Sequence, residues 1–142
     1  MQNVEIPDEA LVYLSEKDEK MARLISEIGP ICRPRHPDLT DALTYAIVGQ
    51  QISTAAQETI YARLVDLLGA ISPETLLAHT PEELQACGLS FRKVSYIQDF
   101  ATRVHTGAFD IAALETMEDD QVIRQLVTLK GIGEWTAEML LL

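Results

Sequence analysis

The sequence predicts an all-α protein, and three observations support that class. Apolar residues recur three and four positions apart in several segments, which is the spacing of a helix with one buried face. A Ser-Pro pair and a Thr-Pro pair, the latter inside a Thr-x-x-Glu box, stand where helices begin. No segment shows sustained alternation of apolar and polar residues between hairpin turns, as a half-buried strand would. We expect about eight helices on short connectors, without a repeat or a low-complexity tract.

The N-terminal segment is predicted to form one helix and a connector. Six apolar positions place a single amphipathic helix over residues 8–28, closed by Gly29-Pro30; they are Leu11, Leu14, Met21, Leu24, Ile25 and Ile28. The stretch "ICRPRHPDL" contains two prolines, which favours a connector. We therefore divide the chain into an N-terminal segment, residues 1–37, and a central helical domain, residues 38–142.

The central domain is predicted to contain a series of helices with recognisable ends. The first begins near Asp38 or Thr40, and the second has Ser53 or Thr54 as its N-cap and Gly69 as its C′ residue. The remaining predictions are short helices from Ser72-Pro73 and Thr80-Pro81, a helix over 90–107, one turn over 110–114 and a helix ending at Leu129.

Composition limits the range of functions. A formal net charge of -11 indicates an acidic surface and argues against general affinity for polyanions such as nucleic acids. Cys32 and Cys87 form no CxxC pair, so we expect both to be small buried side chains. The acidic N-terminus is unlike a signal peptide and no apolar run reaches the length of a membrane span, so we expect a cytoplasmic protein with no membrane partner.

One motif near the end of the sequence suggests chemistry. Gly131-Ile132-Gly133 allows a tight turn between two helices and leaves the first amides of the second helix without partners. Such amides, together with the helix dipole, form an anion site suited to a backbone phosphate, and Lys130 would add charge beside it. The alternative is a plain αα-hairpin whose glycines only permit close packing.

Three separated motifs together narrow the interpretation: "YAIVGQQIS" at 45–53, "GLSFRKVSYI" at 88–97 and "LKGIGEWTAEMLL" at 129–141. In this order and spacing they resemble the helix-hairpin-helix DNA glycosylases, specifically the 3-methyladenine DNA glycosylase II type, which removes alkylated purines. The resemblance covers about residues 40–142. It implies a helix-hairpin-helix glycosylase-like bundle of helices, with the first helix belonging to an incomplete second lobe and double-stranded DNA held between the lobes.

The resemblance also assigns residues. It implies that Gly131-Ile132-Gly133 holds a phosphate, and that Gln51 wedges into the gap left by an extruded base. It places the base pocket at Trp135, Met139 and Gln50, with Met139 where some relatives carry a tyrosine. A monovalent cation, Na⁺ or K⁺, would be bound by main-chain carbonyls of Val127, Leu129 and Ile132, and no other cofactor is implied. The alternatives are that Trp135 lies in the core and that Gln50 or Gln51 is only a polar helix end.

The implied reaction is hydrolytic release of the damaged base. An alkylated purine carries positive charge, which weakens its bond to the sugar and attracts it to an indole such as Trp135. Relatives that also cut the backbone carry a lysine at that position, so this chain would be monofunctional. The family's aspartate, which stabilises the oxocarbenium-like sugar, would lie beyond Leu142.

No acid in the sequence matches the family's aspartate: Asp119 and Asp120 precede the hairpin, and Glu134 and Glu138 flank Trp135. We therefore expect a C-terminally truncated, inactive form. The final helix ends in four apolar residues, which predicts exposed apolar surface near 140–142 and on the first helix. That surface would favour a dimer or a complementing segment.

Two other functional classes remain open. One is a non-catalytic helix-hairpin-helix DNA-binding module, and the other is an acidic helical interaction domain, which the net charge favours. Against the second, Arg92, Lys93 and Arg103 share a predicted helix in which Asp99 is the only acid. The histidines His36, His79 and His105 have no metal-ligand spacing and receive no role. The preferred alkylated base is not predicted.

Overall fold

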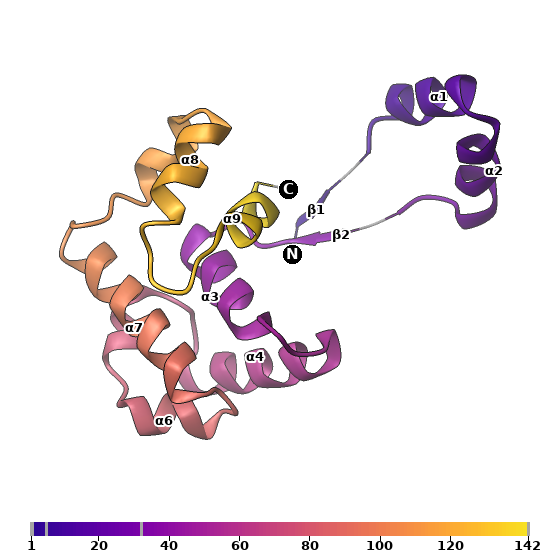
Figure 1. Cartoon of the computed structure of the whole chain (residues 1–142). Helices are drawn as coiled ribbons and strands as arrows, with labels where there is room; N and C mark the ends of the chain where they lie inside the picture. The colour runs from indigo at the N-terminus through magenta and orange to yellow at the C-terminus, as the bar shows by residue number, and fades with distance from the viewer. Residues whose placement is uncertain (1, 5, 32, 142) are drawn as a thin grey trace. The chain divides into compact units, whose positions relative to one another are not determined.

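The structure, a computed structural model, describes residues 2–4, 6–31 and 33–141 (Figure 1). The chain forms two compact units, Met1–Pro37 and Asp38–Leu142. The all-α class is confirmed, because strand structure in the described residues is limited to two segments of three residues each. No helix in the described part of the chain has both the length and the apolar character needed to cross a membrane.

The N-terminal unit contains a small ribbon and two helices. Strand β1, Gln2–Val4, pairs antiparallel with β2, Arg33–Arg35, and between them lie α1, Asp8–Lys17, and α2, Glu19–Ile28. The strands were not predicted, because three residues are too few to show alternation and their pairing joins distant parts of the sequence. Cys32, predicted to be buried, lies outside the described residues.

The prediction of one helix over residues 8–28 is wrong. Asp18 is extended, with φ −147° and ψ 117°, and it ends α1. Its side chain accepts hydrogen bonds from the amides of Lys20 and Met21, at 2.7 Å and 3.1 Å, so it is the N-cap of a new helix. The apolar spacing continues across the break, so it does not reveal that a second helix begins. The sequence signal for the break is Asp18, a residue type that favours the N-cap position.

The larger unit is built almost entirely of helices. Their bounds are Leu39–Gly49 (α3), Thr54–Leu68 (α4), Pro73–Leu77 (α5), Pro81–Ala86 (α6), Phe91–His105 (α7), the 3₁₀ helix Ala112–Thr116 (η1), Asp119–Leu126 (α8) and Glu134–Leu140 (α9). The predicted starts are confirmed at Asp38, Ser53 and Thr80, whose side chains each accept a hydrogen bond from an amide three residues on.

The core of this unit lies around α7, which packs against α3, α5 and α6 (Figure 1). The predicted stripe on α7 is confirmed, since Val94, Ile97 and Phe100 are each 1% exposed or less. Burying side chains of this size stabilises the fold by about 1.5–3 kcal/mol each. Helix α9 packs against both α3 and α8, which brings the hairpin before α9 close to the C-terminal end of α3. Cys87 is buried as predicted, and that burial raises the pKa of its thiol.

Candidate functional site

The hairpin between α8 and α9, residues 127–133, turns at Gly131. This residue has a φ of +80°, which lies in a region of backbone conformation that residues other than glycine rarely adopt. A Cβ atom there would also collide with the ring of Tyr96 on α7. Ile132 is only 5% exposed and anchors the hairpin in the core, while Gly131 and Gly133 stay at the surface. The turn therefore needs glycine at residue 131 and is open to a ligand at its surface.

Gly133 is the N-cap of α9 and differs from Gly131. Its φ of −94° suits any residue, and a Cβ atom there would meet nothing within 4 Å. The fold therefore does not require glycine at this position. Because glycine has no side chain to accept a hydrogen bond, the first amides of α9 are left without a side-chain cap.

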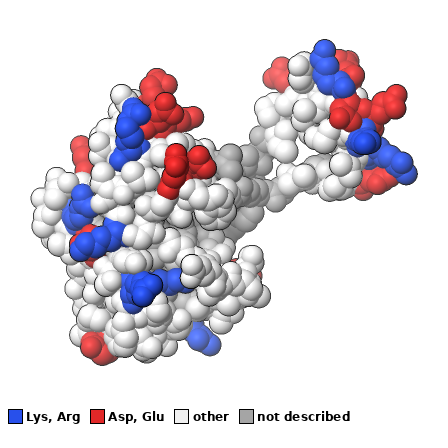
Figure 2. Space-filling view, in the orientation of Figure 1, with Lys and Arg blue, Asp and Glu red and all other residues white. Residues whose placement is uncertain are grey.

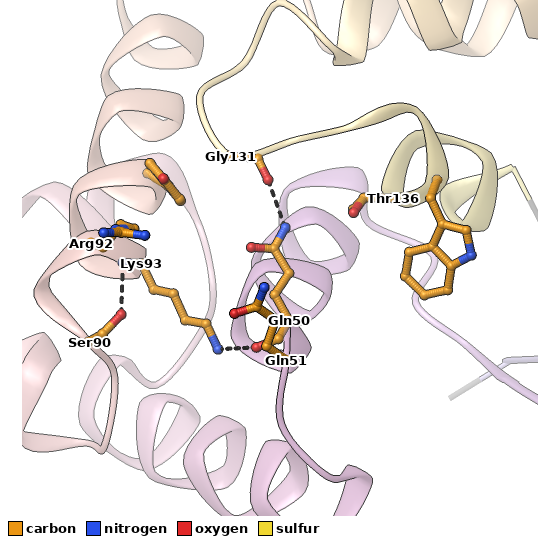
Figure 3. Close-up of a pocket in the computed structure, with 9 residues that line it drawn as sticks. Gln50, Gln51, Ser90, Arg92, Lys93, Gly131 and Thr136 are labelled. Carbon is orange, nitrogen blue, oxygen red and sulfur yellow. Dashed lines mark hydrogen bonds between the residues drawn. The ribbon is translucent and has the colours of Figure 1, made fainter.

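The second part of the site is the loop at the C-terminal end of α3. Gln50 donates a hydrogen bond from Nε2 to the main-chain oxygen of Gly131 at 2.7 Å, which joins this loop to the hairpin (Figure 3). Gln51 has a φ of +57° and is the single non-glycine with positive φ among the described residues. Its side chain is exposed. Strained backbone of this kind persists where surrounding contacts hold it.

Helix α7 supplies the third part of the site. The Lys93 ammonium donates hydrogen bonds to the main-chain oxygens of Val48 and Gln50, both at 2.7 Å, and Figure 3 draws the second of them. Partial burial lowers the pKa of this ammonium, because desolvation disfavours its charged form. Ser90 begins α7 and caps it by accepting a hydrogen bond from the Lys93 amide at 3.3 Å.

These three parts border an open pocket of about 700 Å³. Its lining residues are Gln50, Gln51, Ser90, Arg92, Lys93, Tyr96, Gly131, Trp135 and Thr136. Trp135 is 71% exposed, so the alternative that it is a core residue is wrong. The two lining residues with formal charge at neutral pH are both basic, although the whole chain carries -11. In Figure 2, basic side chains lie over α7, and acidic side chains lie beside a basic one over α8.

Lys130 is less available than its sequence position suggests. Its ammonium forms an ion pair with Asp99 of α7 at 3.1 Å, which offsets part of the charge expected beside the hairpin. Arg103, also on α7, donates a hydrogen bond to the Thr128 carbonyl at 2.9 Å. Helix α7 therefore supports the hairpin at two points.

The structure brings together four of the residues predicted from sequence: Gln50, Gln51, Gly131 and Trp135. Met139 is half-buried and does not line this pocket, and neither do Lys130, Ile132 and Gly133. Sequence reasoning assigned no role to the lining residues from α7, although the motif "GLSFRKVSYI" contains all of them. Thr136 was also missed, and its only signal was its place next to Trp135.

The histidines contribute nothing to this pocket. His79 lies 2.9 Å from the Thr75 carbonyl through Nδ1, and His105 lies 3.5 Å from Glu74. Among the residues that the structure describes, no group of three or more His, Cys, Asp or Glu side chains could hold a metal ion.

Comparison with known proteins identifies the family. Residues 44–140, which include every residue that lines the pocket, match the family described as HhH-GPD superfamily base excision DNA repair protein. The chain belongs to the HhH-GPD superfamily. This confirms the resemblance to helix-hairpin-helix glycosylases drawn from the three motifs.

Individual relatives agree with that assignment. The chain is 29% identical over 140 residues to DNA-3-methyladenine glycosylase 1 of Schizosaccharomyces pombe, covering 94% of this chain and 61% of that protein. It is 37% identical over 110 residues to the DNA-3-methyladenine glycosylase of Saccharomyces cerevisiae, covering 70% of this chain and 37% of that protein. The chain thus spans between about a third and two thirds of these curated relatives.

Solved structures share the fold of this chain. The 3-methyladenine DNA glycosylase of Schizosaccharomyces pombe in complex with abasic DNA matches with a TM-score of 0.82 and 30% identity, over 94% of this chain and 68% of that one. The 3-methyladenine DNA glycosylase of Archaeoglobus fulgidus matches with a TM-score of 0.80 and 27% identity, over 96% of this chain and 50% of that one.

Proposed function

We propose that this chain is the DNA-binding and base-recognition part of a monofunctional DNA glycosylase that releases alkylated purines in base excision repair. The observation that carries the proposal is the pocket, where the hairpin, Gln51 and exposed Trp135 meet on a surface whose charged residues are both basic. The proposal is also supported by membership of the HhH-GPD superfamily and by relatives that are named DNA-3-methyladenine glycosylases.

The proposed ligand is double-stranded DNA containing an alkylated base. The surface turn at Gly131 and the uncapped amides after Gly133 suit a backbone phosphate, because they offer donors where no side chain intervenes. Arg92 is exposed and adds positive charge to the same pocket. The acidic remainder of the surface would keep the DNA at this site, since like charges repel elsewhere.

Gln51 and Trp135 would act on the base itself. A glycosylase must extrude its target nucleotide, and an exposed side chain at the pocket edge, such as Gln51, can occupy the gap that is left. Trp135 offers its indole to a cationic purine, a cation–π contact worth about 0.5–2 kcal/mol. Positive charge on the purine thus favours both its recognition and its departure.

The hydrolytic step requires a carboxylate beside the sugar. Water must bond to the sugar carbon as the bond to the base breaks; the bonding electrons leave on the base, and the water releases one proton to solvent. A carboxylate would stabilise the positive sugar. No acidic side chain lines the pocket among the described residues. We therefore propose that these 142 residues bind DNA without releasing bases, which also favours the second candidate, a non-catalytic DNA-binding module.

A monovalent cation, Na⁺ or K⁺, is proposed at the hairpin. Its ligands would be the main-chain oxygens of Val127, Leu129 and Ile132, which are neutral oxygen donors of the kind that hard cations prefer. The Leu129 oxygen accepts a hydrogen bond from the Ile132 amide at 3.2 Å, which leaves its second lone pair for a cation. Such an ion would neutralise phosphate charge beside the hairpin, and no other cofactor is proposed.

Self-association is a further part of the proposal. In the N-terminal unit Val12, Tyr13 and Ile28 are each more than half exposed, and in the larger unit Leu141 is 38% exposed. Leu142, also predicted to be exposed, lies outside the described residues. Exposed apolar side chains in this number favour a dimer or a complementing segment. Sedimentation that finds only monomer at high protein concentration would contradict this.

The main test compares DNA affinities by fluorescence anisotropy. We expect this chain to bind a duplex with an abasic-site analogue more tightly than the undamaged duplex, and to lose affinity steeply as salt is added. A Trp135→Ala variant should lose affinity for a duplex holding a cationic methylated purine by about tenfold, without losing stability, because the ring is exposed. Absence of binding to every duplex would refute the proposal and favour an interaction domain without a DNA role.

A further inference from the structure

The backbone at Gln51 is held in a conformation that its own side chain does not favour. Its φ of +57° is costly for a residue with a Cβ atom, and no other described non-glycine has a positive φ. Residues next to it offer little local support. Within this loop the Ile52 amide donates only a long hydrogen bond, 3.4 Å, to the Gly49 carbonyl. A contact from elsewhere in the fold must therefore hold this loop.

Two such contacts are present: the Gln50 side chain bonds the Gly131 carbonyl, and Lys93 bonds the carbonyls at the end of α3. Lys93 reaches from α7 to the end of α3, and its two 2.7 Å hydrogen bonds go to the carbonyls of Val48 and Gln50. The second bond, drawn in Figure 3, goes to the residue that directly precedes Gln51. The Lys93 cation is also stabilised here by the helix dipole, because the C-terminal end of α3 carries partial negative charge. The Gln50 carbonyl and the Gln51 amide lie in the same planar peptide unit. A hydrogen bond that fixes the carbonyl therefore fixes the orientation of the peptide plane that precedes Gln51.

The same contact limits what else Lys93 can do. An ammonium has three donors, and two of them are used on main-chain oxygens inside the protein. Lys93 is half-buried, whereas its neighbour Arg92 is exposed. The Arg92 side chain forms no hydrogen bond or ion pair with the described residues. Two adjacent cations on one helix thus differ in availability to a phosphate.

We infer that Lys93 is a positioning residue that holds Gln51 in its positive-φ conformation, so that the wedge is in place before DNA arrives. The inference rests on the proposed function, because it assigns Lys93 to the step in which the extruded base leaves a gap. If Gln51 is already in place, less conformational entropy is lost when DNA binds. Removal of the Lys93 hydrogen bonds should therefore weaken binding of the damaged duplex most, because that duplex has the gap that Gln51 fills.

The test uses Lys93→Met, which keeps the length of the side chain and removes its donors. Its matched control is Arg92→Met, which removes one charge from the adjacent position without touching the loop. We expect Lys93→Met to weaken binding of the abasic-site duplex by about tenfold and of the undamaged duplex by less than about twofold. Arg92→Met should weaken both duplexes alike and lower the salt slope by about one, as for a lost phosphate contact.

A double-mutant cycle with Gln51→Ala separates positioning from contact. If Lys93 acts through Gln51, the double variant should bind no worse than Gln51→Ala alone, whereas Arg92→Met should add to Gln51→Ala. Additive losses from Lys93→Met together with a reduced salt slope would overturn the inference and make Lys93 a phosphate contact.

A measurement without DNA distinguishes failure of this inference from failure of the proposed function. A positive φ gives a strong NOE between the amide proton and the Hα proton of the same residue, so Gln51 should show this signal in the wild-type protein and lose it in Lys93→Met. The Arg92→Met control should retain it. If Gln51 keeps its positive φ in Lys93→Met, the inference is wrong even if DNA binding behaves as proposed. If the NOE is lost but no duplex binds, the proposed function is wrong and the structural role of Lys93 stands.

Discussion

The hairpin and the loop after α3 face the same pocket, but their conformations have different origins. The hairpin turns at Gly131, a residue whose own chemistry permits a φ of +80°. The loop turns at Gln51, a residue whose chemistry disfavours a φ of +57°, and Lys93 on another helix holds its neighbour in place. The conformation of the first turn follows from its own glycine, and that of the second depends on a contact between residues 43 apart in the sequence.

The comparison predicts that the hairpin is the less tolerant of change. Gly131→Ala adds a Cβ atom that meets the Tyr96 ring and forces a strained backbone, so the free energy of unfolding should fall by about 2–4 kcal/mol. Chemical denaturation of the variant measures this. Tyr96→Ala in the same background removes the clash but not the strain, so it should restore only part of the loss. A Gly131→Ala variant as stable as the wild type would show that the turn is not fixed by its glycine.

The hydrogen bond that links the two regions should contribute less to the free energy of unfolding than either turn does. Gln50→Ala removes the 2.7 Å hydrogen bond to the Gly131 carbonyl, and the free energy of unfolding should fall by about 0.5–1.5 kcal/mol. Hydrogen exchange should then increase at the amides of both the loop and the hairpin. Gln51→Ala is the control, since it truncates the next, exposed side chain without breaking that bond. Faster exchange in only one region would mean that the two regions are not coupled through Gln50.

Gly133 should show opposite effects on stability and binding. Gly133→Ser adds a hydroxyl that can cap the first amides of α9, so stability should rise by a few tenths of a kcal/mol, roughly. The same hydroxyl would occupy donors proposed for a phosphate, and affinity for duplex DNA should fall. Gly133→Ala is the control, because it adds a Cβ atom without an acceptor. Unchanged DNA affinity in Gly133→Ser would place the phosphate contact elsewhere.

The smallest expected effect is a pH dependence of stability through Lys93. Burial lowers the pKa of its ammonium below the ordinary value of 10.5, so across the interval between the two the unfolded chain binds more protons than the folded one. The free energy of unfolding of the wild type, relative to Lys93→Met, should therefore rise as pH rises through that interval. Arg92→Met should show no such difference. A fall instead of a rise would mean that the folded protein prefers the charged ammonium.

Much of the fold was predictable because it depends on interactions between near neighbours in sequence. The side chains of Ser53 and Thr80 each bond an amide three residues on, so both helix starts could be predicted from short motifs. The break at Asp18 uses the same chemistry, but the continuous apolar spacing around it suggested one helix. The ribbon of β1 and β2 was beyond prediction, since it exists only when distant segments pair.

The candidate site divides in the same way. The turn at Gly131, the family and the presence of Gln51 and Trp135 at its edge could be read from residue types and spacing, because glycine conformation and motif order are local properties. The exposure of Trp135, the ion pair of Lys130 with Asp99 and the hydrogen bonds from Lys93 to α3 follow only from how α7, α3 and α9 pack. Whether a charged side chain reaches the ligand or an internal carbonyl depends on distances between helices, which residue types and spacing do not specify.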